Sequence, residues 1–254
     1  MEAADDDDDD VLALGDVLGR EYRVIRRLGR GGHAVITLVE HRRSAFAVKT
    51  PSVPAYRAFL DTEIDVLRRV RHANVVDLVR IAECDGSVAL VLEYLPGGSL
   101  KDLIPDDGLP ESIAKPLWDQ IVDAVDACHR AHVYHRDLQP SNIAFTADGR
   151  LKLIDFGLSA YAPNGPVLPD PVGDVGYCSP ENAGQTSRPI LGDKADIWSM
   201  GVILREMLRG RRRADDHRPG RACTAQRLID VMLHEDPARR PTLDSVRQFP
   251  WGMP

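Results

Sequence analysis

The sequence contains no apolar run that approaches the roughly 20 residues of a membrane-spanning helix. Cysteine is scarce, and Cys84, Cys128, Cys178 and Cys223 lie far apart without forming a Cys-x-x-Cys pair. Scarce and widely spaced cysteines argue against a disulfide framework and against a zinc site. We therefore expect a soluble protein that binds no membrane and works in a reducing compartment.

Positive charge is not in excess either, because the chain has 32 Lys and Arg against 39 Asp and Glu. Glu2 and the aspartates of residues 5–10 account for the surplus, so the rest of the chain is formally neutral. This balance argues against a nucleic-acid partner. The acidic N-terminal residues are opposite in charge to a secretory or mitochondrial leader, so a cytoplasmic or nuclear location is expected.

Two segments have a strong charge bias. Residues 1–15 are predicted to form an acidic disordered tail. Residues 209–221 are rich in arginine and lack an apolar period, which predicts an exposed loop. That loop could simply be solvated, or it could bind an acidic partner or the acidic tail.

The first part of the chain has the pattern of a small antiparallel sheet. A length of 254 residues exceeds the usual limit of a single core, so two lobes or two small domains are expected. The segments with the apolar or β-branched character of strands are residues 22–28, 35–39, 46–50, 75–81 and 88–92. Residues 56–71 show helical spacing, which predicts one helix packed on the sheet. An Asp-Gly pair at residues 85–86 predicts a hairpin turn between the last two strands.

The second part, after the Pro-Gly-Gly break at residues 96–98, is mostly helical in its spacing. Two helices are predicted from apolar faces, formed by Ile113, Leu117, Ile121, Val125 and Cys128 and by Ile197, Gly201, Leu204 and Leu208. No internal repeat is found. The order of elements predicts an α+β fold with a β-rich lobe over residues 16–95 and a larger helical lobe over residues 96–254.

Three motifs follow one another along these two parts. Residues 28–36 read Leu-Gly-Arg-Gly-Gly-His-Ala-Val-Ile. Taken alone, this glycine-rich hairpin is as typical of an ordinary turn as of a phosphate-binding loop. Residues 134–142 read Tyr-His-Arg-Asp-Leu-Gln-Pro-Ser-Asn, and residues 152–157 read Lys-Leu-Ile-Asp-Phe-Gly. In their order and spacing these motifs resemble those of the eukaryotic protein kinase family. The resemblance implies the two-lobed kinase-like fold.

Later segments extend the resemblance over residues 20–251. Residues 176–181, 196–201 and 236–242 are similar to the peptide-binding half of the family, which implies a protein substrate that the sequence cannot name. Leu138 resembles the serine/threonine branch of the family, as does Pro140. A regulatory protein partner is also compatible with the resemblance.

The resemblance implies ATP as a substrate and assigns residues to binding it. Lys49 would bind the α and β phosphates and pair with Glu63. The main-chain groups of Glu93 and Leu95 would bind the edge of the adenine. The other residues that correspond to ATP contacts in the family are Leu28, Gly29, Gly31, Ile36, Ala47 and Ala144.

The catalytic roles follow from the same resemblance. Asp137 would be the base that orients a substrate hydroxyl, and Asn142 and Asp155 would hold Mg²⁺. Glu181 and Arg240 are similar to a buried ion pair that anchors the C-terminal lobe, which is a structural role.

Two positions depart from the family pattern: Gln139 replaces a lysine of the catalytic loop, and Asp174 replaces a threonine. Loss of the lysine's cation is expected to cost about 3 kcal/mol, or a hundredfold in rate. We predict a hydrogen bond between Gln139 and Asp174 that closes the substrate side of the site. Residues 160–178 contain no Ser or Thr, so Arg136, which would normally receive an activating phosphate, is predicted to meet Asp170 or Asp174.

Two functions therefore remain open. The first is an active serine/threonine kinase whose catalytic set is Lys49, Asp137, Gln139 and Asn142. The second is a pseudokinase that binds ATP and acts as a scaffold or allosteric partner, because Gln139 and Asp174 impair the chemistry.

Overall fold

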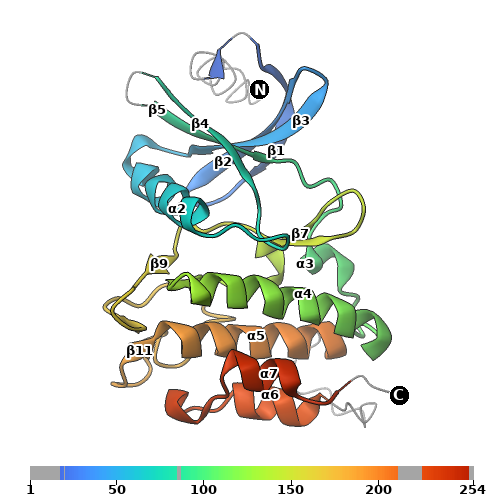
Figure 1. The fold of residues 1–254 in the computed structure, drawn as a ribbon, viewed down its shortest axis with the longest axis vertical. Coiled ribbons are helices and arrows are strands. Elements are labelled where there is room, and N and C mark those ends of the chain that lie inside the picture. The colour runs from blue at the N-terminus through green and yellow to red at the C-terminus, as the bar shows by residue number, and fades with distance from the viewer. Residues whose placement is uncertain (1–17, 20, 85–86, 211–224, 252–254) are drawn as a thin grey trace, which may run out of the picture.

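A computed structural model describes residues 18–19, 21–84, 87–210 and 225–251. The predicted acidic tail, the Asp-Gly turn at residues 85–86 and nearly all of the arginine-rich loop lie outside these residues. Within them the chain forms a β-rich lobe followed by a helical lobe, as Figure 1 shows. The predicted two-lobed α+β fold is confirmed.

The first lobe is built on a five-stranded antiparallel sheet with the order β1-β2-β3-β5-β4. Its strands are β1 (Arg23–Arg30), β2 (Ala34–His41), β3 (Ser44–Pro51), β4 (Leu78–Cys84) and β5 (Ser87–Glu93). All five predicted strands are present, but the fourth begins at Leu78 rather than at Val75. Val75 instead forms a bridge with Leu153 of the second lobe, and the N–H of Val76 donates to the Leu153 carbonyl at 3.0 Å. These residues therefore connect the lobes.

A single long helix, α2 (Arg57–Arg69), packs against this sheet after a short 3-10 turn, η1 (Pro54–Tyr56). Its buried face carries Leu60, Ile64 and Leu67 at the spacing of an amphipathic helix. The same face buries one carboxylate, Glu63, which is fully inaccessible to solvent. The predicted helix is confirmed, with its ends displaced by one or two residues.

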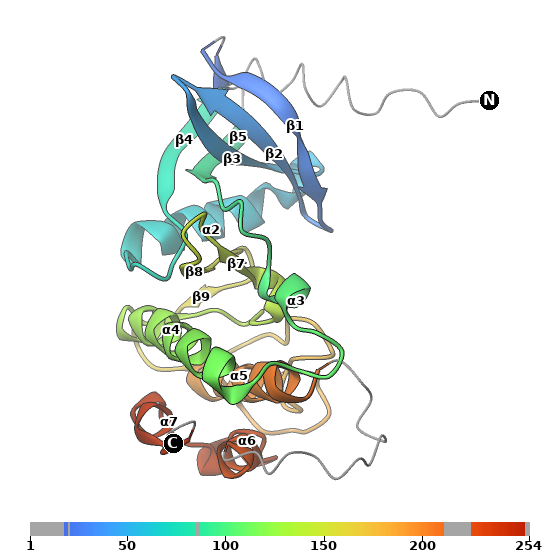
Figure 2. The same ribbon diagram turned by 90° about the vertical axis from the view of Figure 1, so that its right-hand side faces the viewer.

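The second lobe is organised around two long helices, α4 (Glu111–Arg130) and α5 (Gly192–Arg209), which contact one another. Figure 2 shows them stacked below the strands, with α6 and α7 underneath. The shorter helical elements are α3 (Leu100–Leu103), η2 (Pro140–Asn142), α6 (Gln226–Met232), η3 (Pro237–Arg239) and α7 (Leu243–Gln248). The short strands are β6 (Val133–Tyr134), β7 (Ile143–Phe145), β8 (Leu151–Leu153), β9 (Ala160–Tyr161), β10 (Val167–Leu168) and β11 (Ile190–Leu191). Among the described helices, none combines the length and apolar character needed to cross a membrane.

One predicted helical face is partly wrong. Ile121, Val125 and Cys128 of α4 are buried as predicted, but Ile113 is 49% exposed. The buried stripe passes instead through Ala114 and Trp118, because these residues lie four positions apart and in line with Ile121 and Val125. The predicted helical period is correct, but the first two buried residues of the stripe lie one position after the predicted ones.

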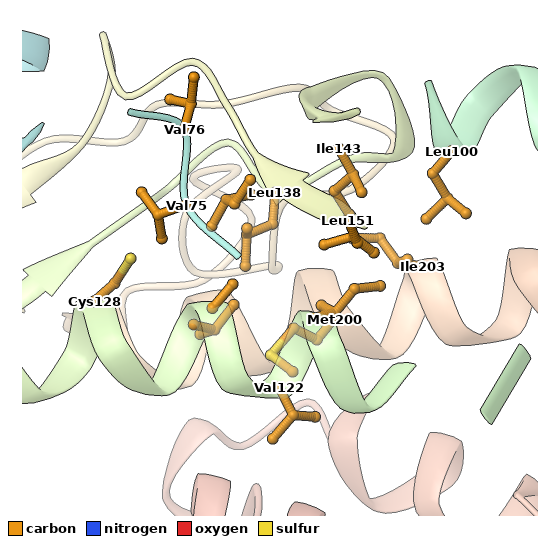
Figure 3. Packing of buried hydrophobic residues seen from close by; sticks show 14 of the residues in the cluster. Val75, Val76, Leu100, Val122, Cys128, Leu138, Ile143, Leu151, Met200 and Ile203 are labelled. Carbon is orange, nitrogen blue, oxygen red and sulfur yellow. The ribbon is translucent and has the colours of Figure 1, made fainter. Parts of the chain in front are cut away.

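The apolar core is continuous through both lobes. A single cluster joins side chains of α2 and β5 to those of α4 and α5, and the residues at the lobe junction belong to it. Figure 3 shows Val75, Leu138 and Leu151 above Val122 of α4 and Met200 of α5. The loops that carry the candidate site are therefore fixed from below by this core.

Candidate active site

The segment with the sequence Tyr-His-Arg-Asp is fixed to helix α5 by a buried carboxylate. Asp196 is 1% exposed and accepts hydrogen bonds from the N–H groups of His135 and Arg136, each at 2.9 Å. The ring of His129 lies 2.8 Å from the same carboxylate. No role was predicted for Asp196 from the sequence, although it lies in a segment that resembles the kinase family. Because Asp196 fixes the main chain of His135 and Arg136, it also fixes the position of the next residue, Asp137.

Asp137 is surrounded by hydrogen-bond donors. The amide nitrogen of Gln139 lies 3.1 Å from both Oδ1 and Oδ2 of Asp137, and Asn142 donates to Oδ2 at 2.9 Å. The N–H of Asp174 donates to Oδ1 at 3.2 Å. Each carboxylate oxygen therefore accepts two hydrogen bonds, which fix the orientation of the side chain.

The predicted hydrogen bond between Gln139 and Asp174 is wrong. Both residues do meet at the carboxylate of Asp137, but each bonds Asp137 rather than the other. The carboxylate of Asp174 instead accepts a hydrogen bond from the N–H of Gly176 at 2.7 Å. Asp174 thus presents its main-chain N–H to Asp137, which avoids a contact between two negative charges.

Lys49 of β3 links the two lobes electrostatically. Its Nζ lies 2.5 Å from Oε2 of Glu63 on α2 and 2.9 Å from Oδ1 of Asp155. Burial alone would lower the pKa of Lys49, but the two carboxylates outweigh it and raise the pKa above its usual value. The predicted Lys49–Glu63 pair is confirmed, and Lys49 remains positively charged.

Asp155 lies at a strained turn beside the site. Its φ is 62°, a left-handed conformation that is uncommon for a residue with a side chain. Burial would raise the pKa of Asp155, but Lys49 reverses that effect and the pKa is lowered. The side chain of Asp155 is 49% exposed, so the carboxylate can reach a ligand. The adjacent Ile154 donates its N–H to the carbonyl of Asn142 at 2.9 Å, which holds the two predicted metal ligands next to each other.

Several of the residues assigned to the nucleotide lie on strands β1, β2 and β3 of the sheet, and one lies on β7 of the other lobe. Leu28 and Gly29 belong to β1, and Ile36 of β2 pairs with Gly29. Ala47 of β3 pairs with Leu92 of β5. At the start of the glycine-rich turn, the N–H of Gly31 donates to the Ala34 carbonyl at 2.8 Å. From the other lobe, Ala144 on β7 forms a bridge with Ser99, close to where the chain enters the second lobe.

Comparisons with known proteins agree with this geometry. Residues 22–221 match the model of the protein kinase domain, which is more than half of the chain. The chain belongs to the protein kinase family. Membership implies ATP as a substrate.

Several curated kinases are similar to this kinase domain. Sperm motility kinase 1 of Mus musculus is 32% identical over 91% of this chain. The CBL-interacting serine/threonine-protein kinase 21 of Arabidopsis thaliana is 31% identical over 89% of it, and the SNF-related serine/threonine-protein kinase of Rattus norvegicus is 34% identical over 91%. The chain spans 51%, 59% and 34% of the lengths of these three proteins, respectively.

In this kinase domain one main-chain group of the assigned adenine site is already engaged. The N–H of Glu93 donates to the carbonyl of Asp77 at 3.1 Å. The side chain of Glu93 lies 2.6 Å from Lys152, which turns it toward the second lobe. The main-chain N–H and the side chain of Glu93 are therefore both engaged by other residues of the chain.

Arg136 and Asn182 bind the main chain of the segment between Asp155 and Glu181 of the kinase. The guanidinium of Arg136 donates to the main-chain carbonyl of Asp170, so the predicted meeting with Asp170 is confirmed, through the backbone rather than the carboxylate. Asn182 binds the main chain of Val172 through both ends of its amide. No role was predicted for Asn182 from the sequence. Arg136 is thus engaged with this segment through Nη2, whereas its buried Nε has no hydrogen-bond partner among the described residues.

Proposed function

We propose that this kinase domain transfers the γ-phosphate of ATP to serine or threonine hydroxyls of a protein substrate. The observation that carries the proposal is the position of Lys49, which contacts Glu63 of one lobe and Asp155 of the other. A cation held in this way can bind phosphates from the first lobe, while Asp155 faces them from the second lobe. The similar curated kinases include two that are named serine/threonine-protein kinases, which supports the choice of hydroxyl.

The donor set beside Lys49 fits Mg²⁺. Asn142 uses its amide nitrogen for Asp137, which leaves its amide oxygen for a metal, and Asp155 has an exposed carboxylate. Magnesium prefers oxygen ligands and is commonly held by one or two carboxylates together with substrate phosphates. When bound, the ion would neutralise charge on the phosphates. We propose Asn142 and Asp155 as its protein ligands.

Asp137 is the group we propose as the base for the substrate hydroxyl. Its four hydrogen bonds orient the carboxylate, and a hydroxyl can approach it by replacing one of the contacts from Gln139. Those contacts are the easiest to give up, because a single amide is shared between two oxygens at 3.1 Å. Gln139 therefore acts as a neutral positioning group where the family has a cation.

A second candidate function is that of a pseudokinase that binds ATP and serves as a scaffold or allosteric partner. The observation that favours it is the same set of contacts, because both oxygens of Asp137 are already saturated by protein donors. Both functions require ATP. The cytoplasmic or nuclear location, the protein substrate and a regulatory partner stay predictions.

Transfer of labelled phosphate from Mg-ATP to a mixed set of serine and threonine peptides separates the two functions. The Asp137→Asn chain supplies the background. Phosphoserine or phosphothreonine above that background supports the kinase. A native chain that stays at background while Mg-ATP still raises its melting temperature contradicts phosphoryl transfer and supports the pseudokinase.

Replacement of Gln139 by lysine is expected to increase the rate of transfer, because an ammonium group would face the charge of the migrating phosphoryl. A gain on the order of a hundredfold is expected from one such preorganised group. The matched control is Gln139→Met, which keeps the length of the side chain without a donor or a charge and should give no gain. An equal or slower rate for Gln139→Lys would contradict the role given to this position.

A further inference from the structure

His33 lies in the glycine-rich turn between β1 and β2, and its ring packs against the start of helix α2. The imidazole stacks on Phe59 of α2, with ring centroids 4.0 Å apart and 28° between the ring planes. It also meets Tyr56 of η1 edge to face, with centroids 5.0 Å apart. Tyr56 and Phe59 contact each other in turn, at 5.8 Å. The three rings therefore form one aromatic cluster that joins the glycine-rich turn to α2.

The main chain of the same turn is tied to the end of β3. The N–H of Ser52 donates to the His33 carbonyl at 2.9 Å, and the Ser52 hydroxyl donates to the Gly32 carbonyl at 3.1 Å. A Cβ placed on Gly32 would meet nothing within 4 Å, so this neighbour of His33 packs on nothing that could hold the turn. The turn thus has a main-chain tether at Ser52 and a side-chain tether at His33.

Phe59 connects the aromatic cluster to the groups around Lys49. A Cβ placed on Gly157 would lie 3.4 Å from the Cβ of Phe59, so Phe59 packs closely on the segment that begins with Asp155. Glu63, which pairs with Lys49, follows Phe59 by four residues on α2 and therefore lies on the same side of that helix. The stack on Phe59 thus brings the glycine-rich turn into contact with the helix that carries Glu63.

We propose that His33 is a positioning residue for ATP, because its stack on Phe59 holds the glycine-rich turn in place before the phosphates bind. The inference rests on the binding of ATP phosphates by this turn, as the family resemblance implies, and not on phosphoryl transfer. A turn that is fixed in advance loses less conformational freedom when a ligand binds, which raises the affinity without a new contact. An aromatic pair is worth between about twofold and tenfold in an equilibrium constant.

Binding of Mg-ATP and of adenosine to the full chain, measured by isothermal titration calorimetry, tests this role. His33→Ala should weaken Mg-ATP by about twofold to tenfold and leave adenosine unchanged, because adenosine has no phosphates for the turn to contact. His33→Phe keeps a ring on Phe59 and should restore the native affinity. If the native chain binds Mg-ATP and His33→Ala binds it equally well or more tightly, the positioning role is overturned and the ATP site is not. A native chain that does not bind Mg-ATP contradicts both.

A double-mutant cycle tests whether His33 acts through Phe59. In a Phe59→Leu chain, which has no ring to stack on, His33→Ala should cause no further loss of affinity for Mg-ATP. A full loss in that chain, or a loss in His33→Phe, would assign the imidazole a direct contact with the phosphates and overturn the stacking role.

The matched control is His41→Ala, because His41 is the last residue of β2 and stacks on Tyr22 with centroids 4.6 Å apart. It removes the same kind of ring contact at the opposite end of the strand from the glycine-rich turn, and should leave the affinity for Mg-ATP unchanged. An equal loss in His41→Ala and His33→Ala would indicate a general effect on the lobe and would contradict the proposal. The melting temperature of each variant shows whether it folds.

Discussion

The Asp137→Asn chain should transfer phosphate about a hundred to ten thousand times more slowly than the native chain, which is the usual contribution of a general base. The substitution keeps the shape of the side chain but removes its charge. It also replaces one acceptor oxygen by an amide that faces the donor groups of Gln139 and Asn142. Binding of ATP should persist, because Lys49 and Asp155 are unchanged.

A matched control separates loss of the base from a general disturbance of the loop. Asp174→Asn leaves the main-chain N–H that contacts Asp137, and an asparagine oxygen can still accept from Gly176. Its rate should stay within about tenfold of the native rate, because no charge that touches the reacting group is lost. Initial rates of phosphate transfer at saturating Mg-ATP, measured for both variants and for the native chain, test these two expectations. A loss of less than tenfold in Asp137→Asn would exclude Asp137 as the base.

The sequence alone predicts the elements of this fold well, because most of them have a local signal. The strands alternate or are β-branched, and α2 has a clear apolar stripe. The fourth strand was placed too early because Val75 and Val76 have the composition of a strand. Their partner is Leu153, far along the chain, and only a three-dimensional arrangement shows that they bond there.

The candidate site was predicted unevenly for a similar reason. The family motifs identified Lys49 and Glu63 because each stands at a recognisable position, and the structure brings them together. The orientation of Gln139 could not be predicted, since a flexible amide bonds whichever neighbour offers the better acceptor. Asp137 offers two oxygens to it, whereas the carboxylate of Asp174 is already occupied by Gly176.

Replacement of Glu181 by glutamine should lower the free energy of unfolding by about 3–5 kcal/mol, because it leaves a buried guanidinium without its counter-charge. Arg240 donates to both carboxylate oxygens of Glu181, at 2.6 and 2.8 Å, and each residue is at most 3% exposed. Arg240 also donates to the carbonyls of His234 and Lys194, so it cannot turn away to solvent without breaking these contacts.

Urea unfolding measures this loss against Glu83→Gln, which removes one charge of the exposed Arg57–Glu83 pair and should lower the unfolding free energy much less than Glu181→Gln does. If both variants lower the free energy of unfolding by the same small amount, Glu181 does not anchor the lobe. The double variant Glu181→Gln, Arg240→Met should be less destabilised than the sum of the two single variants, because no unpaired charge remains buried.

The same pair predicts how acid acts on the native chain. Burial would raise the pKa of Glu181, but its hydrogen bonds with Arg240 outweigh burial and lower the pKa below its usual value. A carboxylate with a lowered folded-state pKa stabilises the fold fully above the unfolded pKa of about 4.3, and this stabilisation is lost as the pH falls through the folded value. The difference in unfolding free energy between the native chain and Glu181→Gln should therefore be constant near neutral pH and shrink below about pH 4. A difference that stays constant down to pH 3 would show that folding does not lower the pKa of Glu181.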